Sequence, residues 1–202
     1  MIPIFIASSQ RFECAEWLAP FSIHENTSAA IEMRIVRPGW YGMCESGCTG
    51  FTNVRWAIPE LLRETGHEFG IYMDVDMLVT GDIEELFEYR RRGQWVTLQD
   101  GSTEVSVICS TLKYPPRESL HLRHKGTLPV GDMLPLIPTV WYCEDQVRPG
   151  MKLLHFTDLN TQPWFYDHPD KEAVRLYESY RNRYWAKFDP RLSPAYTQFG
   201  TA

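Results

Sequence analysis

The segment IYMDVDMLV, residues 71–79, carries the strongest pattern in this 202-residue chain. Its apolar residues predict a buried strand, which two carboxylates interrupt. Successive side chains alternate between the faces of an extended strand, so Asp74 and Asp76 are expected to point the same way. Two unpaired acids there are costly unless a hard divalent cation such as Mg²⁺ or Mn²⁺ neutralises them. The segment indicates a cation site, although an isolated pair of this kind is more often one capping acid and one solvated acid.

Helix signals flank this strand on both sides. Downstream, Gly81 predicts a turn, and Asp82 predicts the N-cap of a helix with acidic residues in its first turn. Upstream, residues 51–62 (FTNVRWAIPELL) predict an amphipathic helix that leads into Gly66 and the strand. The acidic pair therefore lies between two predicted helices.

The block FTNVRWAIPELL…IYMDVDMLVTGDIEELF resembles the glycosyltransferases of the GT-A fold, and is most similar to family eight and its bacterial relatives. These enzymes carry an aromatic-x-x-x-Arg-x-x-x-Pro-x-Leu helix, a strand that ends in Asp-x-Asp, and a Gly-Asp-Ile/Leu-x-Glu-Leu helix. The resemblance covers about residues 1–100 and 150–165. It implies a GT-A-like, Rossmann-type α/β fold with a mainly parallel central sheet flanked by helices. We expect one catalytic domain over residues 1–202.

A further matching segment, MKLLHFT, lies at residues 151–157. The resemblance implies that His155 completes a metal site begun by Asp74 and Asp76. The chemistry agrees, because Mn²⁺ accepts imidazole beside carboxylates and phosphate oxygens. The alternative is a histidine at the end of a buried strand with both ring nitrogens hydrogen-bonded.

Gln162-Pro163-Trp164 follows the histidine segment, as a Lys-Pro-Trp or Gly-Pro-Trp sequence does in the family. Gln162 stands where many relatives carry a lysine that contacts the donor phosphate. Either the cation and Arg55 suffice for the phosphates, or the donor sits differently. Trp164 and Trp40 are candidate platforms for a sugar ring, but core packing is the more common role in a chain with seven tryptophans.

The resemblance places the nucleotide after the first strand, where Ser8, Ser9 and Arg11 are found. Small hydroxyl residues let a base and ribose approach the backbone, and Arg11 could stack or pair. An ordinary helix cap beside a surface arginine explains the same residues equally well. The planar fork of Arg55 matches phosphate oxygens, although an arginine on an exposed helix face has the same signature in sequence.

Composition limits the classes of function. A net charge of −6 argues against nucleic-acid binding. The apolar start, residues 1–7, lacks a basic region and is too short to span a bilayer, so it predicts a first strand. Five scattered cysteines favour reduced thiols and a cytoplasmic location. The sequence does not indicate an oligomeric state.

Strands and helices alternate along the chain, which predicts a largely parallel sheet with ligands beyond the carboxyl ends of its strands. Strands are expected at residues 2–8, 31–36, 69–73, 95–98, 105–109 and 153–156, helices through 14–18, 51–62 and 170–186, a loop at 38–50, and irregular, proline-punctuated chain at 110–150.

The resemblance implies a metal-dependent glycosyltransferase that moves a sugar from a nucleotide-diphosphate donor, expected to be a UDP-sugar, to a glycan or other acceptor. Retention of anomeric configuration and a Mn²⁺ or Mg²⁺ cofactor are implied with it. Asp76 and Arg55 would act in catalysis, by helping to neutralise charge on the leaving phosphate. The sequence offers no clear nucleophile or base, since Asp100, Glu104 and Asp132 read as surface acids.

Two other interpretations stay open. The first is a GT-A-like protein that binds nucleotide or glycan without turnover, which Gln162 and the lack of an evident Asp-Gln element favour. The second is a nucleotidyltransferase, which needs a glycine-rich basic loop after the first strand. Residues 7–13 contain no glycine, so this interpretation ranks last.

Overall fold

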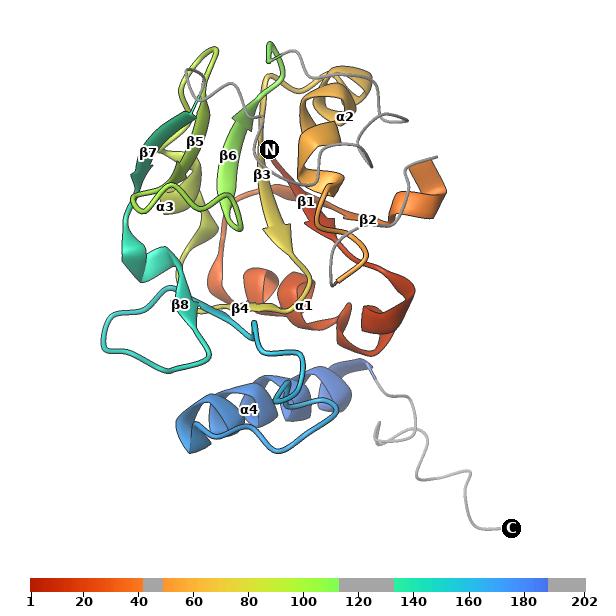
Figure 1. The fold of residues 1–202 in the computed structure, drawn as a ribbon, viewed down its shortest axis with the longest axis vertical. Coiled ribbons are helices and arrows are strands. Elements are labelled where there is room, and N and C mark those ends of the chain that lie inside the picture. The colour runs from red at the N-terminus through yellow and green to blue at the C-terminus, as the bar shows by residue number, and fades with distance from the viewer. Residues whose placement is uncertain (42–48, 113–132, 189–202) are drawn as a thin grey trace.

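The computed structural model describes residues 1–41, 49–112 and 133–188 (Figure 1). Its strands are β1 (Ile2–Ala7), β2 (Ile31–Val36), β3 (Phe69–Asp74), β4 (Met77–Val79), β5 (Trp95–Leu98), β6 (Ser106–Cys109), β7 (Met133–Ile137), β8 (Cys143–Glu144) and β9 (Leu153–His155). Its α-helices are α1 (Leu18–Asn26), α2 (Ile58–Thr65), α3 (Ile83–Phe87) and α4 (Lys171–Phe188).

The described strands form two sheets. The larger has the order β2-β1-β3-β6-β5-β7, and the smaller has the order β4-β9-β8. In the larger sheet β1 pairs in parallel with β2 and β3, and β5 pairs in parallel with β7. Strand β6 runs antiparallel to both of its neighbours. The prediction of an α/β fold with a mainly parallel sheet is therefore confirmed.

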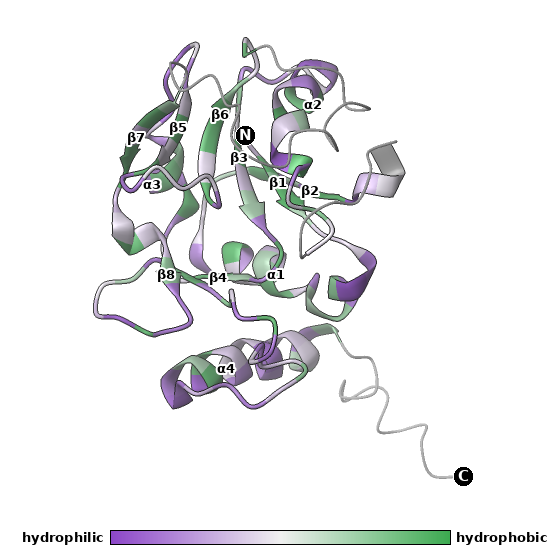
Figure 2. Cartoon of the chain, in the orientation of Figure 1, coloured by the Kyte–Doolittle hydropathy of each residue, from purple (hydrophilic) through white to green (hydrophobic). Residues whose placement is uncertain are grey.

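The centre of the large sheet is buried on both faces. Every residue of β1 is buried, as is all of β3 except Phe69 at its start. A strand covered on both sides carries a continuous apolar run rather than an alternating one, because both of its faces need hydrophobic cover. In Figure 2 the strands of the sheet are coloured mostly as hydrophobic, whereas much of the α4 ribbon is coloured as hydrophilic.

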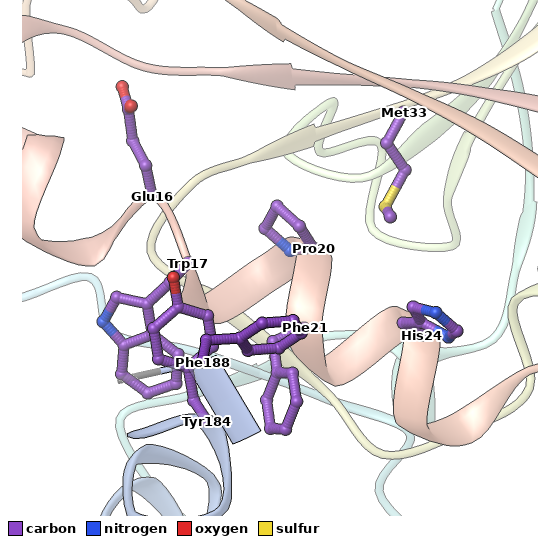
Figure 3. Close-up of a pocket in the computed structure, with 8 residues that line it drawn as sticks. All are labelled: Glu16, Trp17, Pro20, Phe21, His24, Met33, Tyr184 and Phe188. Carbon is purple, nitrogen blue, oxygen red and sulfur yellow. The ribbon is translucent and has the colours of Figure 1, made fainter. Parts of the chain in front are cut away.

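Helix α4 lies beyond the end of the sheet toward which β3 points (Figure 1). It packs against α1 through aromatic rings, with Tyr184 at 4.9 Å from Trp17 and 5.4 Å from Phe21 between ring centroids. Figure 3 shows these rings gathered with Phe188 beside a cavity of about 280 Å³. These contacts belong to a second hydrophobic cluster of the molecule.

The strand expected at residues 69–73 is confirmed as β3, but the apolar run of residues 71–79 is not one continuous strand. Strand β3 ends at Asp74, Val75 and Asp76 form a turn, and β4 begins at Met77 in the other sheet. Hydrogen bonds from Val75 N to Ala7 O at 3.0 Å and from Phe156 N to Asp76 O at 3.0 Å hold the turn from both sides. These partners are remote in sequence, so the local apolar pattern does not reveal the break.

The helix predicted at residues 51–62 is also displaced. A 3-10 helix at Val54–Ala57 precedes α2, which ends at Gly66 in the left-handed conformation with φ +76°. The helix predicted through residues 14–18 is replaced by a 3-10 helix at Gln10–Ala15 and by α1.

The region expected to be irregular, residues 110–150, contains two short strands among its described residues. Strand β7 pairs with β5, and β8 pairs with β9. Prolines such as Pro135 in β7 led to the prediction of irregular chain, because proline cannot donate a ladder hydrogen bond. The predicted strand at 31–36 and the terminal helix are confirmed, and the rest of the predicted 38–50 loop past Tyr41 lies largely outside the described residues.

Candidate active site

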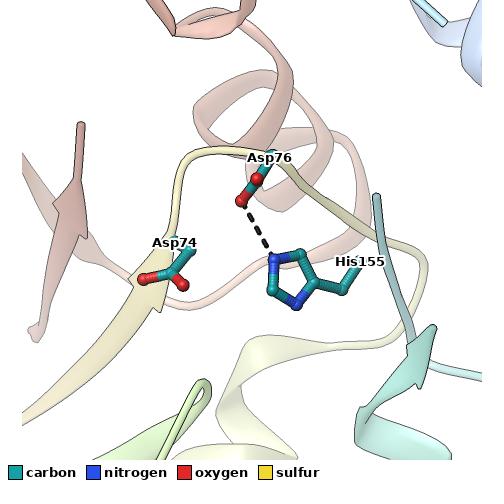
Figure 4. Close-up of side chains that lie close together, drawn as sticks. All are labelled: Asp74, Asp76 and His155. Atoms are coloured by element: carbon teal, nitrogen blue, oxygen red, sulfur yellow. Dashed lines mark hydrogen bonds and ion pairs between the residues drawn. The ribbon is translucent and has the colours of Figure 1, made fainter. Parts of the chain in front are cut away.

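Asp74, Asp76 and His155 converge where β3 ends (Figure 4). One potential ligand atom from each side chain lies within 4.8 Å of the others, and His155 Nε2 lies 3.1 Å from Asp76 Oδ1. The residues are 4%, 2% and 5% exposed, so all three are buried. The structure therefore brings together the three residues that the sequence proposed as metal ligands.

Strand pairing explains why His155 reaches the acids. His155 is the last residue of β9 and pairs with Met77 at the start of β4, in antiparallel register. Asp76 directly precedes Met77, so the ladder sets its carboxylate beside the imidazole. The turn that separates β3 from β4 brings Asp74 close to Asp76 and His155. The sequence analysis expected strand alternation alone to bring the two acids together.

Arg55 is buried at the edge of this cluster, and only 5% of it is exposed. Its Nη2 lies 3.1 Å from Glu104 Oε2 and 3.5 Å from Asp74 Oδ2. Its Nη1 donates to Thr103 Oγ1 at 2.9 Å, and the guanidinium lies 5.2 Å from the Tyr72 ring centroid. The alternative of an exposed surface arginine is therefore excluded. The Arg55 guanidinium, which was expected to bind phosphate, pairs instead with carboxylates of the protein itself.

Glu104 is the site residue that the sequence analysis missed, because it read as a surface acid. Strand β6 runs antiparallel to β3 and Tyr72 pairs with Ser106, so the chain that enters β6 lies beside the end of β3. No local motif marks this residue, and only the sheet order could have found it. Asp100 is exposed as expected, and Asp132 lies outside the described residues.

Burial and mutual repulsion govern ionisation in this cluster. Burial raises the pKa of the Asp74 carboxyl above its ordinary value, with Glu104 and Asp76 adding to the effect and Arg55 opposing it. Burial on its own would lower the pKa of His155, but the hydrogen-bonded Asp76 raises it to about 9. When all of them are ionised, the three carboxylates of Asp74, Asp76 and Glu104 outnumber the two cations, Arg55 and protonated His155, by one charge. An added cation would relieve that excess.

The donor set fits a divalent metal ion. Two carboxylates and one imidazole nitrogen are ligands that Mn²⁺ accepts, and Mg²⁺ prefers the oxygens alone. The geometry allows one atom from each side chain to face a common point, as the 4.8 Å limit on their separation shows.

A second layer of side chains orients these groups. His155 Nδ1 lies 3.2 Å from the hydroxyl of Tyr142. Gln162 is fully buried, and its Nε2 donates to Asp76 Oδ2 at 3.2 Å and to Phe156 O at 2.9 Å. The residue at the expected lysine position thus contacts an acid of the cluster.

The other predicted donor-site residues after β1 differ in exposure. Ser8 and Ser9 follow β1 and are buried, with their hydroxyls donating to Glu16 Oε1 at 2.6 Å and Thr49 O at 2.7 Å. Arg11 is exposed, with its guanidinium 5.9 Å from the Phe12 ring.

Trp164 packs in the aromatic cluster that joins β9 to α4. Its ring centroid lies 5.6 Å from that of Phe156 and 6.0 Å from that of Tyr177. This placement matches core packing, which the sequence analysis held open beside the role of a sugar platform. The side chain of Trp40 is not among those described.

No protein-family model matches this chain, and no curated protein matches it. Solved glycosyltransferase structures do match its fold. The glycosyltransferase GlyE of Streptococcus pneumoniae matches 93% of this chain with 64% of its own, at 13% identity and a TM-score of 0.59. The bifunctional glycosyltransferase WbbM matches 95% of this chain with 51% of its own, at 10% identity and a TM-score of 0.65.

The galactosyltransferase LgtC, in complex with donor and acceptor sugar analogs, is similar over almost its whole length. It covers 92% of this chain and 99% of its own, at 11% identity and a TM-score of 0.60. This chain spans about half to two thirds of WbbM and GlyE. At these identities the likeness shows the fold, which is the GT-A fold of glycosyltransferases that the sequence predicted.

Proposed function

We propose that this chain is a metal-dependent glycosyltransferase that takes a sugar from a nucleotide-diphosphate donor, a UDP-sugar, and transfers it to a glycan or other acceptor. The observation that carries the proposal is the convergence of Asp74, Asp76 and His155 at the strand ends of a glycosyltransferase fold. Ligands of such sheets bind beyond the carboxyl ends of the strands.

In this proposal Asp74, Asp76 and His155 hold Mn²⁺ or Mg²⁺. The cation supplies Lewis-acid stabilisation of the departing diphosphate. Arg55 contacts Asp74 and fixes its orientation. Its positive charge lies at the edge of the cluster, where it would stabilise the negative charge that develops on the departing diphosphate. Retention of configuration is carried over from the family resemblance.

The remaining donor-site residues have supporting roles. Ser8 and Ser9 are small and already hydrogen-bonded, so their contribution is room for the nucleotide to approach the backbone after β1. Arg11 is exposed and free to contact the nucleotide. Gln162 acts on the donor through Asp76, whose carboxylate it holds. Trp164 supports the segment that carries Gln162 rather than presenting an open platform.

UDP is expected to bind only when a divalent cation is present. Without a cation held by Asp74, Asp76 and His155, the negatively charged diphosphate would face the carboxylates of the cluster directly. Calorimetry with UDP should show binding with Mn²⁺, equal or weaker binding with Mg²⁺, and none after EDTA. Mn²⁺ is favoured because one ligand is an imidazole. Equal UDP affinity with and without metal contradicts the proposal.

One observation favours the alternative of a binding protein without turnover. Gln162 lies against Asp76 where relatives carry a phosphate-contacting lysine, so one source of positive charge at the donor is replaced by a neutral amide. A protein of this kind would bind UDP with Mn²⁺ but release no sugar from any nucleotide sugar in a hydrolysis screen. Detectable sugar release excludes it.

Tyr142→Phe is expected to weaken Mn²⁺ binding about tenfold or more, as loss of a group that orients a metal-binding histidine typically does. The Tyr142 hydroxyl lies 3.2 Å from His155 Nδ1, so it holds the imidazole ring with Nε2 beside Asp76. Calorimetric Mn²⁺ titration of the variant measures the change. Tyr166→Phe, at an exposed tyrosine, is the control. Unchanged Mn²⁺ affinity in Tyr142→Phe refutes this role.

The organisation of the chain supports a single catalytic domain over residues 1–202 as part of the proposal. The two hydrophobic clusters of the described residues share Trp164 as a contact. Cys14, Cys109 and Cys143 carry free thiols, which suits the proposed cytoplasmic compartment. Among the described residues, no helix has the length and apolar character needed to cross a membrane.

A further inference from the structure

Glu104 is the solvent-facing acid of the cluster. Its side chain is 32% exposed, against 6% for Asp74 and 2% for Asp76. It lies on the connection that follows β5, immediately before β6. The two buried acids lie close to His155, whereas the Glu104 side chain is partly exposed to solvent.

Arg55 keeps Glu104 in the carboxylate form and in place. The Arg55 Nη2 to Glu104 Oε2 distance is 3.1 Å, and Thr103 accepts from the other end of the same guanidinium at 2.9 Å. A charge-assisted contact of this kind stabilises the ionised acid. A carboxylate has capacity for about four hydrogen bonds, so Glu104 can still accept from a ligand.

The position of Glu104 relates it to the sugar of the donor. Arg55 Nη2 contacts both Asp74 and Glu104, so the two carboxylates are neighbours around one nitrogen. If the cation holds the diphosphate at Asp74 and Asp76, the sugar on its terminal phosphate extends from the buried acids toward solvent. Glu104 borders that path.

We propose that Glu104 lines the donor-sugar subsite and selects neutral hexosyl donors over uronosyl donors, which carry a carboxylate on the sugar. This inference rests on the proposed function. The hydroxyls of a neutral hexose donate to an ionised carboxylate, which is among the stronger hydrogen-bond acceptors. A uronate would bring a like charge to a partly desolvated site, and such juxtaposition opposes binding.

The test uses donor pairs that differ only at C6 of the sugar. UDP-glucose is compared with UDP-glucuronate, and UDP-galactose with UDP-galacturonate, by competition against UDP in the presence of Mn²⁺. The wild-type protein is expected to bind the neutral member of at least one pair about tenfold or more tightly. Glu104→Gln, which keeps an acceptor for Arg55, should bring the two members of that pair within about threefold by strengthening uronate binding.

Glu68→Gln removes an exposed acid that pairs with Arg92 and should keep the wild-type preference. A gain of uronate binding in Glu104→Gln cannot result from misfolding, because misfolding weakens every ligand. The inference is overturned if the wild type binds both members of each pair equally, or if Glu104→Gln keeps the wild-type preference. In either case, Mn²⁺-dependent UDP binding would still support the proposed function. If UDP itself fails to bind with Mn²⁺, the proposed function fails and this inference falls with it.

Discussion

The Asp76→Asn variant is expected to lose Mn²⁺-dependent UDP binding and sugar transfer while it keeps its fold. Asp76 Oδ1 lies beside His155 Nε2 and Oδ2 accepts from Gln162, so the carboxylate sits at the centre of the cluster. Asparagine matches its size but removes the negative charge that the cation requires. We expect transfer to fall by roughly two to three orders of magnitude, the effect typical of losing one electrostatic contact at a transition state.

A melting curve recorded for each variant, together with its transfer rate, distinguishes loss of the active site from loss of the fold. Asp76 is buried, with 2% of it exposed, so the melting curve is needed to show that the fold survives the substitution. The fold is still expected to persist, because the substitution removes one of several clustered negative charges. Asp100→Asn, at an exposed acid after β5, is the control and should keep full activity. Wild-type rates in Asp76→Asn rule the metal site out.

Arg55→Ala is expected to lower the free energy of unfolding by about 3–5 kcal/mol, the usual cost of breaking a buried ion pair from one side. The substitution leaves Asp74 and Glu104 without their cationic partner. Urea denaturation measures the loss. Transfer should also fall by roughly two to three orders of magnitude. Arg55→Lys should recover only part of both losses, since a point charge cannot reproduce the planar fork that contacts Thr103 and two acids.

Two comparisons sharpen the Arg55 experiment. Arg92→Ala removes an arginine whose side chain is 82% exposed, so the loss of its solvent-screened pair with Glu68 should leave the free energy of unfolding nearly unchanged. Combining Arg55→Ala with Glu104→Gln removes one of the two orphaned charges, so the double variant should unfold less readily than Arg55→Ala alone. Equal stability of Arg55→Ala and the wild type contradicts the buried pairing.

The sequence determined the features that depend on neighbours in the chain. Asp82 caps α3 as predicted, since its side chain accepts from Glu84 N at 3.0 Å. Gly66 ends α2 at φ +76°, which glycine adopts without steric cost. The acidic pair and His155 were found because the resemblance links short motifs to a known fold, and that fold is confirmed.

The tertiary structure decided what each of these side chains meets. The turn at Asp76, the burial of Arg55, the contact of Tyr142 with His155 and the contact of Gln162 with Asp76 depend on partners more than ten residues away. Glu104 joined the site only because β6 runs antiparallel to β3. Local propensity and periodicity report energies within a few residues of a position. Pairing order, burial and ionisation follow from contacts between distant segments, so they become visible only once the chain has folded.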